Sequence, residues 1–286
     1  MTNSPAILSG LHEIAYDYDA LVCDVWGVIH NGTAVHMRAV EALRSFRNGF
    51  GPVVLLSNAP RPVDALKEQF ARLGVPKDCY DAIVTSGAAT RAELAERTKG
   101  GRLAIYHLGP ERDRGVFEGL DVVCVAPEEA SVVLCTGLFD DDRETPDDYR
   151  ELLQALYERG LTMLCANPDI VVQRGGVLVY CAGAIARAYE TIGGDVIYYG
   201  KPHTPIYKPV LEAARAAARR DIVRPLAIGD GLETDIRGAD NAGMDSLFIA
   251  DGIHGEEIGD VTEASLARLF GKAQLTARAA MRTLVW

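Results

Sequence analysis

Short apolar runs alternate with amphipathic segments of helical period along most of the 286-residue chain. Runs of strand length occur at residues 21–25, 53–56, 82–85, 103–106, 122–125, 132–135, 161–166, 196–199, 225–228 and 246–250. Segments of helical period occur at residues 38–48, 62–74, 145–159, 184–192, from 204 onward, after 234 and at 262–282. This alternation predicts an α/β fold, in which helices cover both faces of a mostly parallel sheet.

Near residue 100 the alternation of apolar runs and helical segments begins again, as expected of a second folding unit. We therefore expect a Rossmann-like parallel-sheet core, formed by residues 1–98 and 179–286, that is interrupted by a smaller α/β insertion at residues 99–178. The last helical segment, residues 262–282, is expected to pack on the outside of the core. No internal repeat or low-complexity segment is visible.

Charge and composition limit the classes of partner. The formal charge is −11, with 29 Lys and Arg against 40 Asp and Glu, which argues against nucleic acid and anionic membranes as partners. No apolar run approaches the length of a membrane span, and the first twenty residues do not resemble a signal peptide. Six cysteines are scattered without a C-x-x-C pair, which favours reduced thiols over disulfides or a zinc site. We expect a cytoplasmic protein with small-molecule partners.

Polar residues follow several of the predicted strands, where ligands bind in an open parallel sheet. They are Asp24, Ser57 with Asn58, Lys201, and Asp230 with Asp235. One carboxylate can attack phosphorus while another holds Mg²⁺. A hydroxyl group can bind phosphoryl oxygens, and a lysine can neutralise the charge that develops on them. The set predicts a site that handles phosphoryl groups.

The order of these residues resembles the four motifs of the haloacid dehalogenase superfamily. The matching segments are residues 24–28 (DVWGV), 57–59 (SNA), 200–202 (GKP) and 229–236 (GDGLETDI). An insertion between the second and third motifs resembles class IIA, the sugar- and nitrophenyl-phosphatase branch with a large α/β cap. Residues 85–87, 167–169 and 238–244 are also similar to that branch. The resemblance extends from about residue 19 to residue 252 and implies a Mg²⁺-dependent hydrolase.

The resemblance also implies a role for each metal-site residue. Asp24 would be the nucleophile and a ligand of Mg²⁺. The backbone carbonyl of Trp26 would be a second ligand and Asp230 a third. Asp235 would lie outside the ligand shell, where it would orient metal-bound water or the catalytic lysine.

The phosphoryl group would be held by residues of the second and third motifs. Ser57 and the adjacent amide of Asn58 would bind its oxygens, and Lys201 would bridge it to Asp24. Arg61, just after the second motif, is a candidate contact for a substrate anion.

Asn167 and Asp169 of the cap either face the substrate or form a plain turn. Caps of this branch often dimerise, which implies a homodimer formed through the cap.

One residue departs from the pattern of the resembling phosphatases. They carry a second Asp two residues after the nucleophile as general acid and base, whereas this chain has Trp26. An indole N–H can only donate a hydrogen bond and does not titrate usefully. The rate enhancement of about 10²–10⁴-fold that general acid–base catalysis typically contributes would therefore be missing. The leading hypothesis is a phosphatase of a small phosphorylated metabolite that favours good leaving groups. An aspartyl-phosphate at Asp24 would hydrolyse slowly unless His30 or a cap residue replaces the missing base. The alternative is a phosphometabolite-binding protein with little or no turnover.

A run of three carboxylates, residues 140–142, also invites a calcium hypothesis. It lacks the alternating ligands and the glycine of an EF-hand loop. We therefore expect a solvated loop ahead of the helix that begins near Thr145.

Overall fold

A computed structural model describes residues 4–174 and 177–286. The chain divides into two compact units. The first comprises Met1–Ser57, Lys67–Val84 and Lys201–Trp286, and the second comprises Asn58–Leu66 and Thr85–Gly200. Each has its own sheet, which confirms the predicted α/β fold class.

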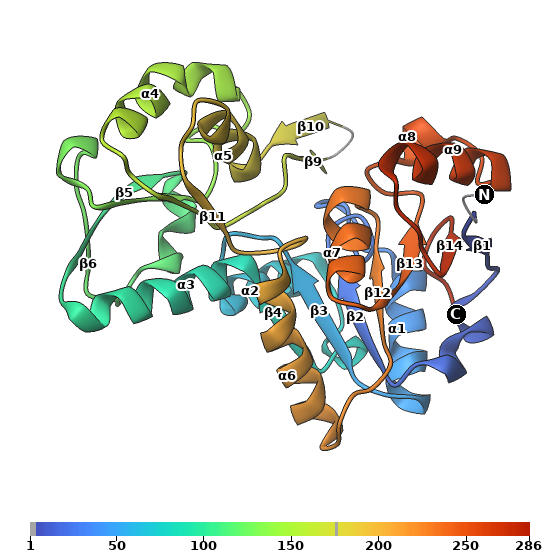
Figure 1. The fold of residues 1–286 in the computed structure, drawn as a ribbon. Helices are drawn as coiled ribbons and strands as arrows, with labels where there is room; N and C mark the ends of the chain where they lie inside the picture. The colour runs from blue at the N-terminus through green and yellow to red at the C-terminus, as the bar shows by residue number, and fades with distance from the viewer. Residues whose placement is uncertain (1–3, 175–176) are drawn as a thin grey trace. The chain divides into compact units, whose positions relative to one another are not determined.

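The first unit is built on a seven-stranded sheet with the order β1-β14-β13-β12-β2-β3-β4 (Figure 1). Its strands are β1 (Ala6–Ile7), β2 (Ala20–Asp24), β3 (Val53–Ser57), β4 (Ala82–Thr85), β12 (Pro225–Gly229), β13 (Asp245–Ile249) and β14 (Ala279–Met281). The pairs from β1 to β3 along this order are parallel. Every residue of β2 and β3 is buried, because helices cover both faces of a parallel sheet.

The helices of this part of the chain are α1 (Met37–Gly49), α2 (Val63–Leu73), α6 (Tyr207–Ala218), α7 (Arg237–Asn241), α8 (Gly255–Ile258) and α9 (Glu263–Ala273). From β2 the chain proceeds to β3 and β4 on one side, and from β12 to β13 and β14 on the other. Right-handed connections in opposite directions place their helices on opposite faces. The order of strands therefore switches between β2 and β12, and a crevice at the carboxyl ends of such a strand pair is the usual ligand site.

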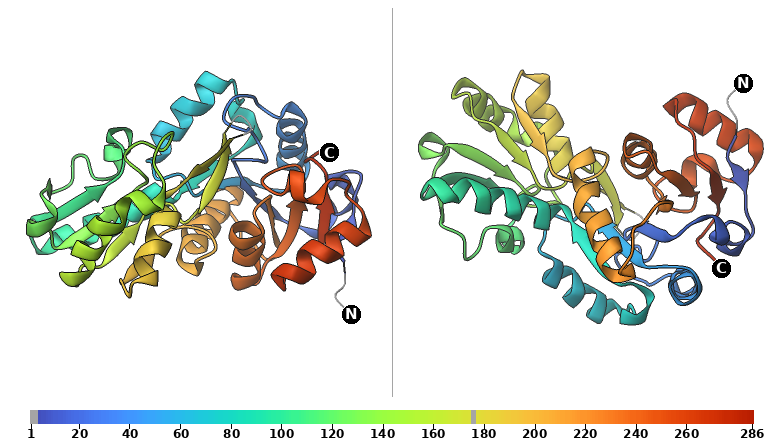
Figure 2. Two further views of the ribbon diagram at one scale, coloured as in Figure 1. Left: turned by 90° about the horizontal axis from the view of Figure 1, so that it is seen from above. Right: turned by 60° about the horizontal axis from the view of Figure 1, so that its bottom comes forward.

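The second unit contains a five-stranded sheet with the order β11-β8-β7-β5-β6. Its strands are β5 (Leu103–Leu108), β6 (Val122–Cys124), β7 (Val132–Cys135), β8 (Met163–Cys165) and β11 (Val196–Tyr198), all paired in parallel. The helices α3 (Ser86–Arg97), α4 (Arg150–Glu158) and α5 (Ala182–Thr191) cover its two faces (Figure 2). Neighbouring residues of β7 point to opposite faces, so Val132 and Val133 belong to different apolar clusters.

Several short elements complete the structure. Strands β9 (Val171–Arg174) and β10 (Val177–Tyr180) pair in antiparallel orientation. A single turn of π-helix, η9 (Leu232–Ile236), precedes α7. The 3₁₀ turns are η1 (Leu11–Glu13), η2 (Ala15–Asp17), η3 (Lys77–Cys79), η4 (Thr98–Gly100), η5 (Glu111–Val116), η6 (Pro127–Glu129), η7 (Pro146–Tyr149) and η8 (Thr204–Ile206).

The predicted C-terminal helix over residues 262–282 was wrong in its second half. Helix α9 ends at Ala273, and Gln274 adopts a left-handed conformation with φ 54° that stops it. Residues 279–281 then form β14, which is fully buried between β13 and β1. An apolar run this short is compatible with either a helix or a strand, and sheet pairing decided between them.

The grouping of elements differs from the predicted insertion at residues 99–178. Strand β11 pairs with β8, and α5 packs in the same apolar cluster as β7 and β8. Residues up to Gly200 therefore group with the second unit, and we propose limits of 85 and 200 for the cap. The difference arises because the pairing partner of a strand cannot be identified from its own residues. The predicted end of the insertion, at residue 178, falls inside β10. Residues 175 and 176, just before that strand, lie outside the described residues.

The expectation of a solvated acidic loop was wrong for Asp141, which is largely buried in ion pairs. Its carboxylate binds Arg112 at 2.5 Å and Arg174 of β9 at 2.7 Å, and its side chain is only 11% exposed. Burial opposes ionisation, but the two arginines together hold the pKa of Asp141 below its usual value. The loop thus fastens β9 to the segment after β5.

All six cysteines are free thiols, and five of them are buried, as the scattered spacing predicts. The exception is Cys124 at the end of β6, which is exposed. None of the described helices combines the length and the apolar character that crossing a membrane requires.

Candidate active site

Three carboxylates of the first unit converge at the switch point of its sheet. Asp24 is the last residue of β2, Asp230 directly follows β12, and Asp235 lies in the π-helical turn after it. One oxygen from each of the three lies within 4.8 Å of the other two, and all three residues are buried. The predicted metal-site carboxylates are therefore together in space.

Lys201 lies among these carboxylates. Its ammonium group donates a short hydrogen bond to Oδ1 of Asp24 and another to Oδ1 of Asp235, at 2.5 Å. The lysine is 4% exposed, so the two ion pairs are shielded from water. Buried pairs of this kind need several partners to offset the cost of desolvation, and two carboxylates provide them.

Two glycines make room for the Asp230 carboxylate. A methyl group at Gly27 or at Gly252 would overlap its oxygens. The carboxylate also accepts a hydrogen bond from the backbone N–H of Ile253 at 2.7 Å. Asp230 is thus held between the loop after β2 and the loop after β13, in a fixed orientation.

Asp235 is oriented by the turn that contains it. The N–H of Gly231 donates to its Oδ2 at 3.0 Å, while its Oδ1 accepts from Lys201. A side chain on Gly229 would collide with Asp235, so the close approach to β12 requires glycine there. Single π-helical turns of this kind are frequent at functional sites.

The electrostatics of the cluster are dominated by negative charge. Burial raises the pKa of Asp24 well above its usual range, and repulsion by Asp235 and Asp230 raises it further. Lys201 acts in the opposite direction but does not offset the sum of these effects. A buried surplus of carboxylate is costly unless a cation is shared between the groups.

Ser57 lies at the same end of the sheet as Asp24. Strands β2 and β3 pair with Asp24 opposite Leu56, so Ser57 is one residue further toward the carboxyl end. The residue is 6% exposed and ends β3. This position is compatible with its predicted role as a ligand of phosphoryl oxygens.

Trp26 occupies the position expected for an acid–base Asp and packs against neighbouring residues of its own loop. Its ring meets the His30 ring edge to face, with centroids 5.2 Å apart, and a side chain on Gly32 would overlap it. The N–H of Gly27 donates to the carbonyl of His30 at 2.8 Å, which closes the loop. Glycine at residue 32 therefore provides the space that the indole fills.

His30 does not have the properties of a replacement base. It is fully buried, and its Nδ1 accepts a hydrogen bond from the N–H of Gly32 at 3.0 Å. Its Nε2 has no hydrogen-bond partner among the described residues, and burial lowers the pKa of His30 to about 4. The imidazole is therefore neutral near pH 7, and in this structure it has no access to water.

In the second unit, the second-motif residue Asn58 bonds to the loop of residues 167–169. The amide of Asn58 donates to Oδ1 of Asp169 at 2.8 Å, and its Oδ1 accepts from Ser86 at 3.2 Å. Asn167 holds the same loop by accepting the N–H of Asp169 at 3.0 Å. Gly200, of the third motif, packs so closely here that a methyl group would overlap Ser86 and Asn58. Residues of three separate segments are thus joined.

Arg61 is paired within the second unit. Its Nε donates to Asp113 of η5 at 3.1 Å, and its own carbonyl accepts from Thr85 at 2.7 Å. Asp113 is only 3% exposed, while the Arg61 side chain remains 31% exposed. Its predicted contact with a substrate anion would have to share the guanidinium with Asp113.

Asp113 and Tyr207 lie near these groups but were not predicted from the sequence. Asp113 follows β5 in a segment without a motif, so nothing in the pattern indicated its pairing with Arg61. Tyr207, at the start of α6, is buried; burial raises its pKa, and the charges of Lys201, Asp235 and Asp24 act on it.

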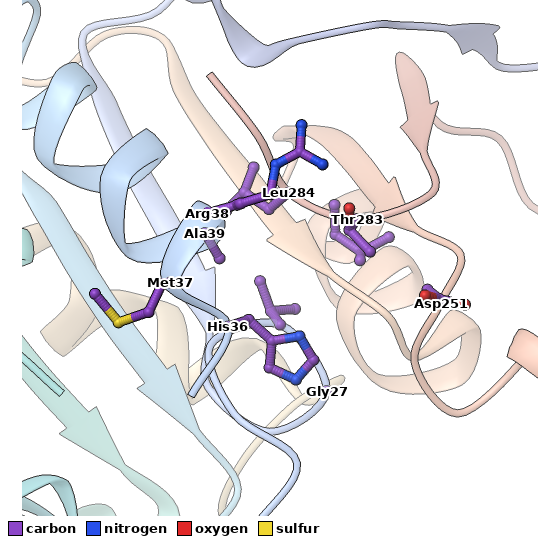
Figure 3. A pocket seen from close by; sticks show the side chains of 10 residues that line it. Gly27, His36, Met37, Arg38, Ala39, Asp251, Thr283 and Leu284 are labelled. Carbon is purple, nitrogen blue, oxygen red and sulfur yellow. The ribbon is translucent and has the colours of Figure 1, made fainter. Parts of the chain in front are cut away.

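A cavity of about 260 Å³ borders the loop after β2 in the first unit. It is lined by Gly27, Val28, His36, Met37, Arg38, Ala39, Ile249, Asp251, Thr283 and Leu284 (Figure 3). None of the clustered carboxylates and neither Lys201 nor Ser57 lines it. The chemistry of the side chains, rather than the size of this cavity, therefore locates the candidate site.

Two family models match the chain. A model described as haloacid dehalogenase-like hydrolase matches residues 21–123, and one described as HAD-hydrolase-like matches residues 198–267. Together they include all the residues of the carboxylate cluster and Lys201.

Solved structures and curated proteins show the same similarity. A hydrolase of the haloacid dehalogenase-like family from Brucella suis 1330 is 42% identical, with a TM-score of 0.87 over 98% of this chain and 100% of that one. The ribonucleotide monophosphatase NagD of Escherichia coli is 24% identical over 82% of this chain and 88% of its own. A glycerol phosphate phosphatase from Mycobacterium tuberculosis, solved in complex with magnesium, is 24% identical over 84% of this chain and 70% of that one, with a TM-score of 0.62.

Proposed function

The chain belongs to the haloacid dehalogenase-like hydrolase family as a class IIA phosphatase-like hydrolase, and we propose that it dephosphorylates a small metabolite, with Mg²⁺, through an aspartyl-phosphate at Asp24. The observation that carries this proposal is the buried cluster of Asp24, Asp230 and Asp235 around Lys201. The relatives named phosphatases support the reaction class.

The donor set fits a hard divalent cation. Carboxylate oxygens are the ligands that Mg²⁺ prefers, and three of them meet within 4.8 Å against a single ammonium group, that of Lys201. We propose Asp24, Asp230 and the carbonyl of Trp26 as direct ligands, with Asp235 holding Lys201 and outer water. When bound, Mg²⁺ would neutralise charge on the phosphoryl oxygens.

The residues of the chain would carry out two displacement steps. In the first, a carboxylate oxygen of Asp24 forms a bond to phosphorus, and the bond from phosphorus to the leaving oxygen breaks with its electron pair. Ser57 and the amide of Asn58 would hold the phosphoryl oxygens while Lys201 balances their charge. In the second step, water attacks phosphorus, the bond to Asp24 breaks, and inorganic phosphate is released.

Proton transfer is the step for which the residues that the structure describes offer no evident group. An alkoxide leaving group needs a proton as it departs, and the attacking water must lose one. Trp26 can do neither, and His30 is neutral, buried and without access to water. Leaving groups that are stable as anions would therefore be favoured.

We expect aryl phosphates to be turned over at least about 10²-fold faster than alkyl phosphates, because the missing acid contributes about 10²–10⁴-fold to loss of a poor leaving group. The measurement is phosphate release from 4-nitrophenyl phosphate and from glycerol phosphate at the same Mg²⁺ concentration. Equal and fast release from both would contradict the leaving-group argument. Failure to release phosphate from either would favour the alternative, a phosphometabolite-binding protein.

The bond from Asn58 to Asp169 leads to a second prediction, because it joins the phosphate-binding turn to the cap loop. Asp169→Ala removes the acceptor, and we expect the inhibition constant of inorganic phosphate to rise about tenfold. Asp169→Asn keeps an oxygen acceptor and should stay within about threefold of the wild type. Asp142→Ala, at an exposed carboxylate of the cap, is the control. Equal phosphate affinity in all four proteins would remove this positioning role.

The predicted homodimer through the cap stays a prediction, as does the cytoplasmic location.

A further inference from the structure

The cap sheet has a switch point of its own. In chain order its strands are β5, β6, β7, β8 and β11, whereas in space β5 lies between β6 and β7. From β5 the chain passes outward to β6 and then returns across β5 to β7. The segment after β5 packs in the apolar cluster of α3, and the segment after β7 packs in the cluster of α4 and α5. Loops that diverge in this way leave a crevice at the carboxyl ends of the two strands.

The shortness of β6 widens this crevice. Strand β6 pairs only with Leu103–Ile105 of β5, and the last bond runs from the N–H of Val125 to the carbonyl of Ile105. Strand β5 continues to Leu108, beyond the end of its neighbour. A cavity of about 400 Å³ lies at this place, lined among others by Tyr106, His107, Val125 and Phe139. Cavities of this size accept small organic ligands.

The floor of the cavity is well ordered by local contacts. Gly109 has a φ of 154°, and a methyl group there would overlap Oγ1 of Thr136, so the loop after β5 lies directly on the end of β7. Nε2 of His107 is 2.9 Å from the same hydroxyl, and burial lowers the pKa of His107 to about 4. The ring of His107 also packs edge to face on Phe117. The lining is thus rigid and neutral at this end.

The rim of the cavity combines an aromatic ring with a cation. Phe139 is 45% exposed, although it is a large apolar side chain. Arg114 lines the same cavity with its guanidinium 5.5 Å from the Phe117 ring centroid. Glu111 also lines the cavity and forms an ion pair with Arg114 at 3.3 Å. Both side chains are exposed, and such pairs contribute little, so an anion can replace the carboxylate on the guanidinium.

We propose that this cap crevice binds a nucleoside monophosphate, with the base against Phe139 and the phosphate on Arg114, as a ligand separate from the substrate attacked by Asp24. A base has a flat face that stacks on an aromatic side chain, and guanidinium groups bind phosphate oxygens in pairs. Every lining residue belongs to the cap unit, and none lies in the four motifs.

Isothermal titration calorimetry of the full chain tests this, in EDTA so that no turnover occurs. The probes are adenosine monophosphate, adenosine and inorganic phosphate. We expect the monophosphate to bind at least tenfold more tightly than either fragment. Arg114→Gln should weaken the monophosphate about tenfold and leave adenosine unchanged. Phe139→Leu, which keeps apolar volume, should weaken both the monophosphate and adenosine.

Two further variants make the result decisive. Arg150 lies outside the crevice and forms an ion pair with Asp147 at 2.9 Å, with the same i,i+3 spacing as Arg114 and Glu111. Arg150→Gln should therefore leave the affinities for all three probes unchanged. Ser57→Ala alters the candidate phosphoryl site and should leave binding of the monophosphate intact. Unchanged adenosine affinity in Arg114→Gln also shows that the crevice is folded. The proposal is overturned if the wild type does not bind the monophosphate at millimolar concentration. It is equally overturned if Ser57→Ala abolishes binding while Arg114→Gln retains it.

Discussion

Asp24→Asn is expected to lower turnover of an aryl phosphate by at least about 10⁴-fold, because a carboxamide is a poor nucleophile. When one member of a cooperating set of catalytic residues is removed, most of the rate enhancement of the whole set is lost. Asp24 is both the proposed nucleophile and a member of the carboxylate cluster that would hold Mg²⁺. Initial rates of 4-nitrophenyl phosphate hydrolysis at saturating Mg²⁺ measure this loss.

The control for Asp24→Asn is thermal unfolding in EDTA. The substitution removes one of three buried carboxyl groups and keeps the shape of the side chain, and Lys201 retains Asp235 as a partner. We therefore expect a melting temperature equal to or above that of the wild type. Mg²⁺ should raise the melting temperature of the wild type more than that of the variant. Substantial residual turnover in a folded variant would contradict the nucleophile assignment.

Trp26→Asp is expected to raise turnover of an alkyl phosphate by about 10²–10⁴-fold, since it introduces a group that can protonate the leaving oxygen and accept a proton from water. The gain in kcat/KM for an aryl phosphate should be far smaller, because kcat/KM reports the first displacement and that leaving group departs as an anion. Turnover of glycerol phosphate and 4-nitrophenyl phosphate by the same preparation measures the difference between them.

The control for Trp26→Asp is Trp26→Asn, which opens the same space near His30 and Gly32 without adding an acid. We expect no gain in the asparagine variant. A gain of similar size in both variants would mean that the indole restricts access, and the acid–base explanation would then be wrong. Thermal unfolding of both variants would show how much stability the packing of Trp26 on its loop contributes.

The convergence of these core residues could be predicted because each part of the pattern is local. Asp24 directly follows a wholly apolar strand, and Asp230 follows another, so each position is indicated by its own segment. Because the carboxyl ends of parallel strands lie at one edge of the sheet, motifs that are separate in sequence are predicted to form one cluster there. The convergence of Asp24, Asp230, Asp235 and Lys201 agrees with that prediction.

Other features could not be predicted because they depend on partners distant in sequence. Asp141 was expected to be solvated, yet it lies between arginines of two other segments. His30 was a candidate base, and only burial and the bond from Gly32 exclude it. Residues 279–281 became a strand because the edge of β13 was available to pair with them.

The amino-acid sequence by itself determined the alternation of strands and helices, the family, and the order of acidic and basic residues along the strand ends, since these follow from local pattern. Tertiary structure alone decided which strands pair, how the elements group into two units, and which charged groups are buried against each other. The physical reason is that periodicity and turn chemistry act between near neighbours in the chain, whereas pairing, burial and the shifted pKa of a group such as Asp24 are set by residues that the fold brings together from afar.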